Sequence, residues 1–367
     1  MTDPAKNLLI LGSGKIGSLI ACLLSQDRSY QVHLADKSLD AIPAPVADVL
    51  RGRVKLVELN AEDPVALKKY VQAEQLTTLL SSLPYHCNKL VADIALQTGA
   101  NYFDLTEDVE VTRHVAKISA GATQAFVPQC GLAPGYISIV TNSLIGKFDE
   151  VKTVKMRVGA LPVNPNNVLK YSLTWSTDGL INEYGNLCYG IESGVMTTLL
   201  PLEGYETITI DGLLYEAFNT SGGLGSLAET YAGRVETMNY KTLRYPGHCK
   251  KIKLLMYDLK LNEDRETLNR ILENAVPKTK QDVVVIYVAV SGIREGDLFE
   301  ENYVKKIYPR VIEGIEWSAI QVTTAAGICA VVDQVLNDPG RFSGLVRQED
   351  LSHEEILANQ YGRYYAE

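Results

Sequence analysis

The most restrictive feature of this sequence is a glycine-rich turn between an apolar run and a helical pattern. Residues 7–11, NLLIL, have the continuous apolar character of a buried parallel strand. Residues 12–17, GSGKIG, follow at once and fit G-x-G-x-x-G. Residues 14–25 then repeat apolar side chains at helical spacing, which predicts a helix with one buried face. A turn of this kind between a strand and a helix predicts a dinucleotide-binding site.

Each glycine of the motif has a separate physical role. Gly12 permits the tight turn, Gly14 lets the backbone approach a pyrophosphate, and Gly17 lets the helix pack closely on the strand. The free N–H groups at the helix N-terminus favour the phosphates. Cofactor contacts are therefore predicted at Gly12, Ser13, Gly14, Lys15, Ile16 and Gly17. The alternative is that the glycines only form a turn in an α/β domain without a ligand.

An acidic residue at the end of the next strand strengthens the cofactor prediction. Asp36 lies nineteen residues after Gly17, where a carboxylate accepts hydrogen bonds from the ribose hydroxyls of NAD and repels the 2′-phosphate of NADP. Lys37 and Ser38 follow directly and suit a phosphate, so NADP remains the alternative. The pattern favours NAD.

Two further loops are expected at the same edge of the sheet, where ligands bind in such folds. Asn60 and Asp63, after the third strand, are predicted to cover the adenine. Ser81, Ser82, Leu83 and Pro84, after the fourth, are predicted to line the nicotinamide end, and Tyr85 to border a substrate. The alternative is that both are ordinary βα loops, with Asp63 before Pro64 as a helix start.

Strands alternate with helices through the first third of the chain, which predicts a doubly wound parallel sheet. The predicted strands are residues 7–11, 30–35, 54–58, 77–81, 101–104 and 125–128, and the predicted helices 14–25, 65–72, 88–98 and 111–120. A Pro/Gly segment, residues 131–135, marks a hinge. We expect a Rossmann domain over residues 1–132, completed by residues 323–367.

Residues 133–322 are expected to form an α+β domain on a mostly antiparallel or mixed sheet. After a helix over 136–146, strands are predicted at 152–159, 171–175, 206–210, 250–258 and 283–291, with helices at 179–184 and 265–274. The last helix, 323–336, is apolar nearly all round, and we expect it to return to the first domain.

Composition narrows the class of protein. The net charge of −9 and the absence of a long Lys/Arg run argue against nucleic acid as a partner. Lys250, Lys251 and Lys253 are interpreted as the solvated face of a strand. Six scattered cysteines show no zinc spacing, so no metal is predicted, and they suit a reducing compartment. Residues 1–6 carry no apolar signal core and no long apolar run occurs, so we expect a soluble cytoplasmic protein without a membrane segment.

Four segments resemble a known family. They are residues 129–135, QCGLAPG, residues 173–184, LTWSTDGLINEY, residues 219–223, NTSGG, and residues 240–248, YKTLRYPGH. They resemble the saccharopine dehydrogenase family, and the last points to its lysine 6-dehydrogenase branch. The resemblance runs from Leu8 to about Leu351.

This resemblance implies an NAD(P)-dependent amino-acid dehydrogenase that transfers hydride at a C–N bond in the side chain of lysine or in saccharopine. It also implies a Rossmann domain, a sheet-rich domain for substrate and dimerisation, and a homodimer. Saccharopine reductases tend to carry an arginine near the position of Asp178. The acid here puts recognition of glutamate in doubt and suits a cationic substrate.

Several side chains are candidates for the chemistry, which needs a proton acceptor and a clamp for the substrate carboxylate. Asp104 ends a strand at the ligand edge and is predicted as a half-buried general base, with Glu107 as the weaker choice; the alternative for Asp104 is a helix cap. Arg244 is predicted to hold the α-carboxylate, against a structural ion pair. His248 is a candidate proton relay, and Tyr85, Tyr171 and Trp175 are candidate walls for the aliphatic part of the substrate, against purely structural roles.

Three rivals to this function remain open. One is a reductive condensation of the carboxynorspermidine type. Another is a regulatory protein that binds NAD without catalysis, and the third is a scaffold that binds no cofactor.

Overall fold

The computed structural model describes residues 6–40 and 42–366, which form two compact units. The first unit comprises Met1–Tyr136, Val311–Ile315 and Gln321–Glu367, and the second Ile137–Arg310 and Glu316–Ile320. Residues 1–5, where no signal sequence is expected, lie outside the described residues. The predicted fold class is confirmed: a parallel Rossmann-like sheet, a second mixed sheet and a C-terminal helix that belongs to the first unit.

The first unit is built on a seven-stranded parallel sheet with strand order β17-β6-β5-β4-β1-β2-β3. The strands are β1 (Lys6–Leu11), β2 (Tyr30–Asp36), β3 (Val54–Glu58), β4 (Thr78–Ser81), β5 (Asn101–Asp104), β6 (Ala125–Val127) and β17 (Gly344–Leu345). The polypeptide winds outward in both directions from β1, so the strand order reverses between β1 and β4. The carboxyl ends of the strands at such a switch point form the usual ligand edge.

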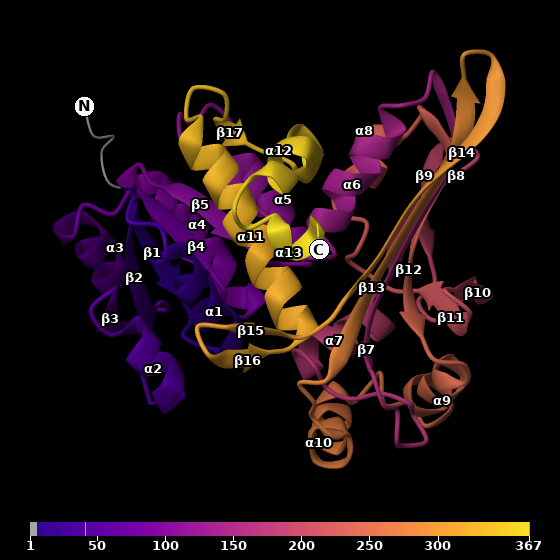
Figure 1. The fold of residues 1–367 in the computed structure, drawn as a ribbon, viewed down its shortest axis with the longest axis horizontal. Coiled ribbons are helices and arrows are strands. Elements are labelled where there is room, and N and C mark those ends of the chain that lie inside the picture. Colours follow the sequence, from indigo (N-terminus) through magenta and orange to yellow (C-terminus); the bar gives the residue numbers. More distant parts are fainter. Residues whose placement is uncertain (1–5, 41, 367) are drawn as a thin grey trace. The chain divides into compact units, whose positions relative to one another are not determined.

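Helices cover this sheet. They are α1 (Lys15–Leu24), α2 (Ala44–Leu50), α3 (Pro64–Ala73), α4 (Tyr85–Thr98), α5 (Val109–Ile118), α11 (Ala319–Asn337), α12 (His353–Ala358) and α13 (Arg363–Ala366), with a 3₁₀ turn at Gln348–Asp350. One core joins the sheet to α3, α4 and α5 through Leu9, Leu79, Leu67, Val91 and Val115. Figure 1 shows the yellow α11–α13 beside the indigo and magenta elements of this unit.

The burial of helix α11 accounts for its apolar composition. Among the described residues it is the one helix long and apolar enough to cross a membrane. Of its most apolar window, 78% is buried inside the structure, with Ala325, Cys329 and Val332 fully covered. Such burial is typical of the core helix of a folded domain.

The second unit is built on an eight-stranded mixed sheet. Its main path is β10-β11-β12-β7-β13-β14, with β8 beside β12 and β9 beside β8. β7 and β12 are parallel, and the other pairs are antiparallel. The strands are β7 (Glu150–Pro162), β8 (Cys188–Glu192), β9 (Val195–Leu199), β10 (Glu206–Ile210), β11 (Leu213–Asn219), β12 (Val235–Arg244), β13 (Asp282–Arg294) and β14 (Asp297–Ile307); β15 (Arg310–Ile312) and β16 (Ile315–Trp317) pair separately.

Helices of the second unit pack on this sheet. They are α6 (Tyr136–Ile145), α7 (Thr177–Gly185), α8 (Leu227–Tyr231), α9 (His248–Lys253), the π-helix η1 (Leu254–Asp258) and α10 (Arg265–Ala275). A core of Tyr184, Phe218, Ile252, Met256 and Leu268 joins α7, α9 and α10 to the sheet. This core surrounds the residues of the predicted substrate site.

The strand predicted over residues 250–258 is wrong, because this segment forms α9 and η1. The buried side chains are Cys249, Ile252 and Met256, whose spacing of three and four is that of a helix. Lys250 is exposed and Lys251 and Lys253 are partly exposed, so these lysines are solvated but lie on a helix.

The strand predicted over residues 171–175 is also wrong. The side chain of Asn167 bonds both the carbonyl oxygen and the N–H of Tyr171, which fixes a turn. Only Leu173 makes a bridge, to Lys278. The apolar side chains of this segment are buried without a strand ladder.

Candidate functional site

The glycine turn of the first unit has the geometry that a pyrophosphate requires. Gly12 has φ +100°, a conformation that side chains rarely adopt, and its N–H bonds Ala35. A Cβ on Gly17 would lie 1.9 Å from the carbonyl oxygen of Gly12, so only glycine lets α1 approach the turn. A Cβ on Gly14 would meet no atom within 4 Å. The space in front of Gly14 is therefore open, which fits a cofactor.

The N-terminus of α1 is free to bind an anion. Gly14 is its N-cap and provides no side-chain cap, and the first turn contains no acidic residue. The N–H groups of the first turn, which includes Lys15 and Ile16, therefore have the partial positive charge that phosphate oxygens prefer. When bound, a nicotinamide cofactor would supply the hydride chemistry, and these residues are predicted to hold it.

Asp36 is tied to the glycine turn. Its Oδ2 accepts from the N–H of Ser13 at 2.7 Å and from the Ser13 hydroxyl at 3.0 Å. Its Oδ1 accepts from the N–H of Lys37 at 2.7 Å. The carboxylate thus stands beside the pyrophosphate turn at the end of β2, in the position from which it would reach a ribose.

In the loop after β3, Asp63 and Asn60 have structural roles, one of which, the helix cap at Asp63, was the alternative to cofactor binding. Asp63 caps α3, and its Oδ1 accepts from the N–H groups of Val65 and Ala66. The side chain of Asn60 accepts from the N–H of Glu62 at 3.1 Å. Asp63 therefore acts as the helix start, and an adenine contact from either residue stays a prediction.

The loop after β4 is held by its own serines. Ser81 donates to Asn88 at 2.6 Å, and the Ser82 hydroxyl lies 3.0 Å from the carbonyl oxygens of Leu11 and Gly12. Leu83 packs on the core and Pro84 is the N-cap of α4. Ser82 therefore ties this loop directly to the glycine turn. Tyr85 begins α4 with 43% of its surface exposed, and its contact with substrate stays a prediction.

Asp104 is fully buried rather than half-buried. Its Oδ1 accepts from the N–H groups of Thr106 and Gln129 at 3.0 and 2.9 Å, and its Oδ2 accepts from the Tyr102 hydroxyl at 2.7 Å. Burial raises the pKa of this carboxyl to about 6. It does not cap the next helix, because Asp108 does so. Asp104 instead fixes the loop that follows β6.

Glu107 fits the role of proton acceptor better than Asp104 does. It lies in the loop after β5, at the ligand edge of the sheet, and is partly exposed. Burial raises the pKa of its carboxyl, to which Asp108 and Asp104 add. A partly accessible carboxyl with a raised pKa is a stronger base than an ordinary glutamate, which suits a proton acceptor.

Arg244 is the centre of a buried polar cluster in the second unit. Its guanidinium donates to the Tyr184 hydroxyl from Nε at 2.8 Å and to the Thr242 hydroxyl from Nη1 at 2.6 Å. The rings of Tyr171 and Tyr184 lie 5.0 and 5.7 Å from its charge. Nη2 has a longer contact, 3.5 Å, with Glu183. The arginine is thus oriented on one side and weakly paired at its tip.

His248 is the first residue of α9 and is buried within this cluster. Its Nδ1 lies 2.8 Å from the carbonyl oxygen of Leu169, which requires a proton on Nδ1. Nε2 then accepts from the Tyr184 hydroxyl at 3.0 Å. Burial, with the charge of Arg244, lowers the pKa of His248 to about 3. The imidazole is neutral and locked, so a relay role has no support from its contacts.

Sequence reasoning missed Glu183, whose carboxylate faces Arg244. It lies in the LTWSTDGLINEY segment, directly before Tyr184, and it is largely buried. Its place in the predicted helix, directly before Tyr184, was the signal that could have identified Glu183. The aromatic candidates contribute to packing: Tyr171 and Trp175 belong to the core around α7, and the Trp175 ring packs on Gly179.

Asp178 does not belong to the Arg244 cluster. Its side chain is exposed on α7 and accepts a hydrogen bond from Asn269 of α10. The inference that an acid here receives a cationic substrate therefore loses its structural basis. The charged pair of Arg244 and Glu183 is the candidate for contact with a substrate instead.

The parallel sheet with its glycine turn, Asp36 and open helix N-terminus defines a dinucleotide-binding Rossmann protein with an added sheet domain. Comparison with known families gives the narrower assignment. Residues 8–127 match the saccharopine dehydrogenase NADP binding domain, and residues 131–363 match the saccharopine dehydrogenase C-terminal domain. The chain belongs to the saccharopine dehydrogenase family, a family of NAD(P)-dependent oxidoreductases that act on CH–NH donors.

Individual relatives are distant. A saccharopine dehydrogenase [NADP(+), L-glutamate-forming] of Schizosaccharomyces pombe is 22% identical over 95% of this chain and 82% of its own length. The apo structure of the L-Glu-forming saccharopine dehydrogenase from Saccharomyces cerevisiae has a TM-score of 0.76 and 18% identity, over 98% of both proteins. A homospermidine synthase from Legionella pneumophila, in complex with NAD, has a TM-score of 0.68 and 14% identity over 98% of this chain and 89% of its own. These two structures establish the shared fold.

Proposed function

We propose that this protein is an amino-acid dehydrogenase that oxidises the terminal C–N bond of the L-lysine side chain with NAD(P). Saccharopine is the second substrate to be tested. The proposal depends mainly on one observation, the buried Arg244 whose Nη2 lies 3.5 Å from Glu183.

The Arg244 and Glu183 pair suits the head of an α-amino acid. Nε and Nη1 of Arg244 already donate to Tyr184, Thr242 and Leu243, so Nη2 is the donor left for a substrate carboxylate. The Glu183 carboxylate matches an α-ammonium group. The contact between Arg244 Nη2 and Glu183 is long, at 3.5 Å, so a zwitterion that binds both side chains replaces it with two shorter hydrogen bonds as the side chains move apart. The series of hydrogen bonds from Arg244 through Tyr184 to His248 fixes the guanidinium in advance, which lowers the entropy cost of binding.

The number of buried cations supports lysine over saccharopine. Among the described residues of the second unit, the lysine and arginine side chains that are almost fully buried are Arg157 and Arg244, and the buried His248 is neutral. Arg157 is occupied by Glu206 at 2.5 Å and by the carbonyl oxygens of Met156 and Asn239. Arg244 is then the buried cation available for a substrate carboxylate. Lysine has one such group, whereas saccharopine has three.

Glu107 is proposed as the proton acceptor, because an amine must lose a proton before its carbon gives up hydride. The carboxyl is at the ligand edge of the first unit, and its pKa is raised by burial. We also propose NAD as the preferred cofactor, since the Asp36 carboxylate beside Ser13 would repel a 2′-phosphate.

A turnover assay tests this proposal. The purified protein is supplied with NAD or NADP and with lysine or saccharopine, each pair separately, while reduced nicotinamide is followed by absorbance. Turnover on lysine with NAD is the expected result. Turnover on saccharopine alone would overturn the choice of substrate. Binding of NADH without turnover on any amine would favour the regulatory alternative.

Substitution of Arg244 tests its role directly. Arg244→Lys keeps the charge but loses both the Nη2 donor and the hydrogen bonds that orient the guanidinium, so we expect KM for lysine to rise about 10- to 100-fold with a smaller change in kcat. Glu183→Gln should raise KM in the same direction, because it removes the partner of the α-ammonium group. Steady-state kinetics measures both.

The exposed Arg234 of the same unit provides the matched control, and Arg234→Ala should leave KM unchanged. Thermal unfolding and NADH binding are measured on every variant, because Arg244 is buried and its loss affects packing. An unchanged KM in a folded Arg244→Lys variant would remove Arg244 as the carboxylate clamp.

A reductive condensation is the second candidate function, since the shared fold with a homospermidine synthase accommodates amine substrates in that enzyme class. The discriminating assay supplies NADPH with an amine and an aldehyde. Consumption of NADPH that requires both would favour condensation over oxidation of lysine.

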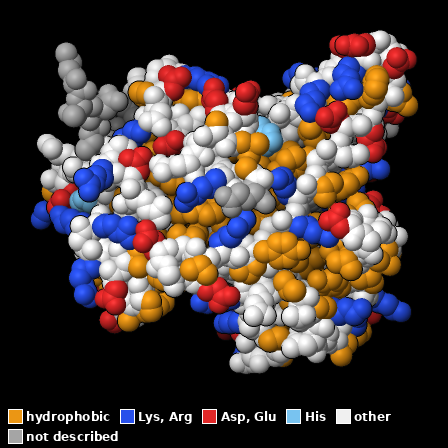
Figure 2. All heavy atoms as spheres, viewed as in Figure 1, with side chains coloured by type: hydrophobic (Ala, Val, Ile, Leu, Met, Phe, Trp, Pro, Cys, Tyr) orange, Lys and Arg blue, Asp and Glu red, His pale blue; other side chains and the backbone are white. Residues whose placement is uncertain are grey.

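We propose that the protein is a homodimer through its second unit. Leu213 and Leu214, at the start of β11, expose about half of their surface, and Tyr205 and Leu200 are exposed nearby in sequence. Figure 2 shows apolar side chains gathered over the part of the second unit that contains β10 and β11. A second copy would cover them. Light scattering should give twice the monomer mass of 40.3 kDa.

We also propose a cytoplasmic location. All six cysteines are free and buried, as suits a reducing compartment. Cell fractionation would test this, and recovery in an exported fraction would contradict it.

A further inference from the structure

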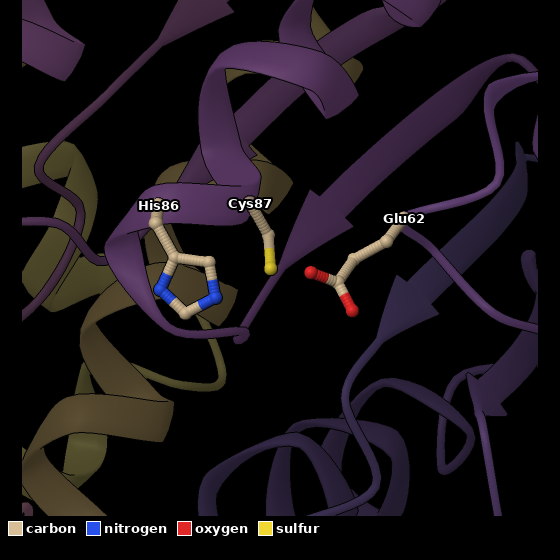
Figure 3. A group of neighbouring side chains, drawn as sticks. All are labelled: Glu62, His86 and Cys87. Atoms are coloured by element: carbon tan, nitrogen blue, oxygen red, sulfur yellow. The ribbon is translucent and has the colours of Figure 1, made fainter.

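Three side chains of the first unit with metal-binding chemistry come together at the ligand edge of its sheet. Glu62 lies in the loop between β3 and α3, and His86 and Cys87 lie in the first turn of α4. One donor atom from each lies within 4.8 Å of the other two. Figure 3 shows the imidazole of His86, the thiol of Cys87 and the carboxylate of Glu62 around one open space.

The arrangement follows from the fold. Helices α3 and α4 pack side by side on one face of the parallel sheet, through Leu67, Val71 and Val91 among others. Both helices follow strands of the same direction, so their N-termini lie at the same edge. Glu62 lies two residues before the first residue of α3, and Cys87 is in the first turn of α4. Their separation in sequence explains why cysteine spacing gave no sign of this group.

In the part of the chain that the structure describes, the three side chains make no hydrogen bond or ion pair, although the His86 ring lies edge-on to Tyr85 with 5.9 Å between ring centroids. Each of the other four histidines has a polar partner for its ring: His33 bonds Tyr70, His114 bonds Asp93, His248 bonds Tyr184 and His353 bonds Tyr136. Within residues 6–40 and 42–366, His86 has no hydrogen bond or ion pair through its ring, and neither the Glu62 carboxylate nor the Cys87 thiol has one. Cys87 is also the most exposed of the six cysteines, at 8%.

The donor set selects the kind of ion. Thiolate, imidazole and carboxylate together are ligands typical of Zn²⁺, whereas Ca²⁺ and Mg²⁺ prefer oxygen alone. The usual zinc bond lengths place the ligand atoms of a tetrahedral site roughly 3.4–3.6 Å apart. Closing from 4.8 Å needs rotation of the two exposed side chains, Glu62 and His86, while Cys87 stays in place.

We propose that Glu62, His86 and Cys87 bind one Zn²⁺ ion, with water in the fourth position. The Cys87 thiol gives its proton to solvent as the sulfur–metal bond forms, so binding strengthens as pH rises. The ion would connect the loop before α3 to the start of α4. Glu62 lies within the loop predicted to cover the adenine, and His86 and Cys87 closely follow the loop predicted to line the nicotinamide end. This site is independent of the proposed substrate, and its test needs no turnover.

Cobalt substitution gives the most direct test. Metal-free full-length protein is titrated with Co²⁺, which shows a thiolate-to-metal charge-transfer band when bound by cysteine. We expect one Co²⁺ per protein molecule, displacement by Zn²⁺, and a higher thermal unfolding midpoint with Zn²⁺. Cys87→Ser should abolish the band, and His86→Gln or Glu62→Gln should weaken Co²⁺ binding at least about tenfold.

Matched controls replace similar residues away from the group. Cys188→Ser removes another buried thiol and His114→Gln another partly exposed imidazole, and both should bind Co²⁺ like the wild-type protein. His86→Gln and Glu62→Gln change exposed side chains, so they keep the test decisive if Cys87→Ser fails to fold. A charge-transfer band that persists in Cys87→Ser, or wild-type protein that gives none, would overturn the proposal.

Discussion

Gly14→Ala is expected to fold like the wild-type protein and to bind NAD(P)H at least about tenfold more weakly. The backbone of Gly14, at φ −61° and ψ −174°, is one that alanine adopts without strain. In the absence of cofactor, the added Cβ would meet no atom within 4 Å. In the complex, it would stand where the backbone has to approach the pyrophosphate, so the cost appears only on binding.

Gly17→Ala provides the contrast to this variant. Its Cβ would lie 1.9 Å from the carbonyl oxygen of Gly12, so the turn itself has to move and both stability and binding should fall. Fluorescence titration of NADH gives the Kd of each variant, and thermal unfolding gives its stability. Wild-type affinity in Gly14→Ala would mean that the pyrophosphate lies elsewhere and that the glycine motif only forms a turn.

The fold of the first unit could be predicted because its signals are local. Its inner strands β1, β4, β5 and β6 are buried along most of their length and appear in the sequence as apolar runs, such as Leu8–Leu11, which are fully buried. The helices start at residues with a clear capping role, such as Asp63 and Asp108. In these elements the turn, strand and cap signals lie within a few residues of one another, whereas the helix α2 and the edge strand β17 were not predicted.

The second unit was harder because its patterns depend on distant partners. Residues 250–258 have β-compatible composition, yet Ile252 and Met256 pack against α10 and select a helix. β12 was not predicted as a strand: its burial alternates over Met238, Tyr240 and Thr242, but Leu243 and Arg244 are buried as well, which breaks the pattern.

The candidate site shows the same division. The positions of Gly12, Gly14 and Asp36 could be predicted, since their roles follow from backbone geometry and strand order. The environment of Asp104 and the pairing of Arg244 with Glu183 could not, because burial and partners arise from segments far apart in sequence. Residue type alone does not say which carboxyl is accessible.

Asp104→Ala is expected to destabilise the first unit strongly. It leaves two buried N–H groups, those of Thr106 and Gln129, and the Tyr102 hydroxyl without their acceptor. Each unsatisfied buried donor costs about 1–3 kcal/mol, so the free energy of unfolding should fall by several kcal/mol relative to Asp104→Asn. The asparagine oxygen can still accept from both N–H groups, and its amide can donate to Tyr102.

The pH dependence separates the charge of Asp104 from its hydrogen bonds. Its pKa in the folded protein is about 6, above the ordinary value of 3.8, so the folded state binds more protons between these values. The stability contributed by this group is present below about pH 4 and is lost as pH rises through about pH 6. The loss at neutral pH is roughly 3 kcal/mol. Asp104→Asn has no such loss, so its stability relative to the wild-type protein should improve from about pH 4 to pH 7.

Denaturant unfolding of the three proteins across this pH range, with kcat measured for each folded one, decides what Asp104 does. If it only fixes the loop after β6, Asp104→Asn keeps its turnover while Asp104→Ala loses stability. The difference between these two uncharged variants then stays constant with pH, because neither titrates at this position. A general base would behave otherwise: Asp104→Asn would remain folded and lose about 100-fold or more in kcat. Since all three contacts of the Asp104 carboxylate lie within the first unit and serve its backbone and Tyr102, we expect the first outcome, which would leave Glu107 as the proton acceptor.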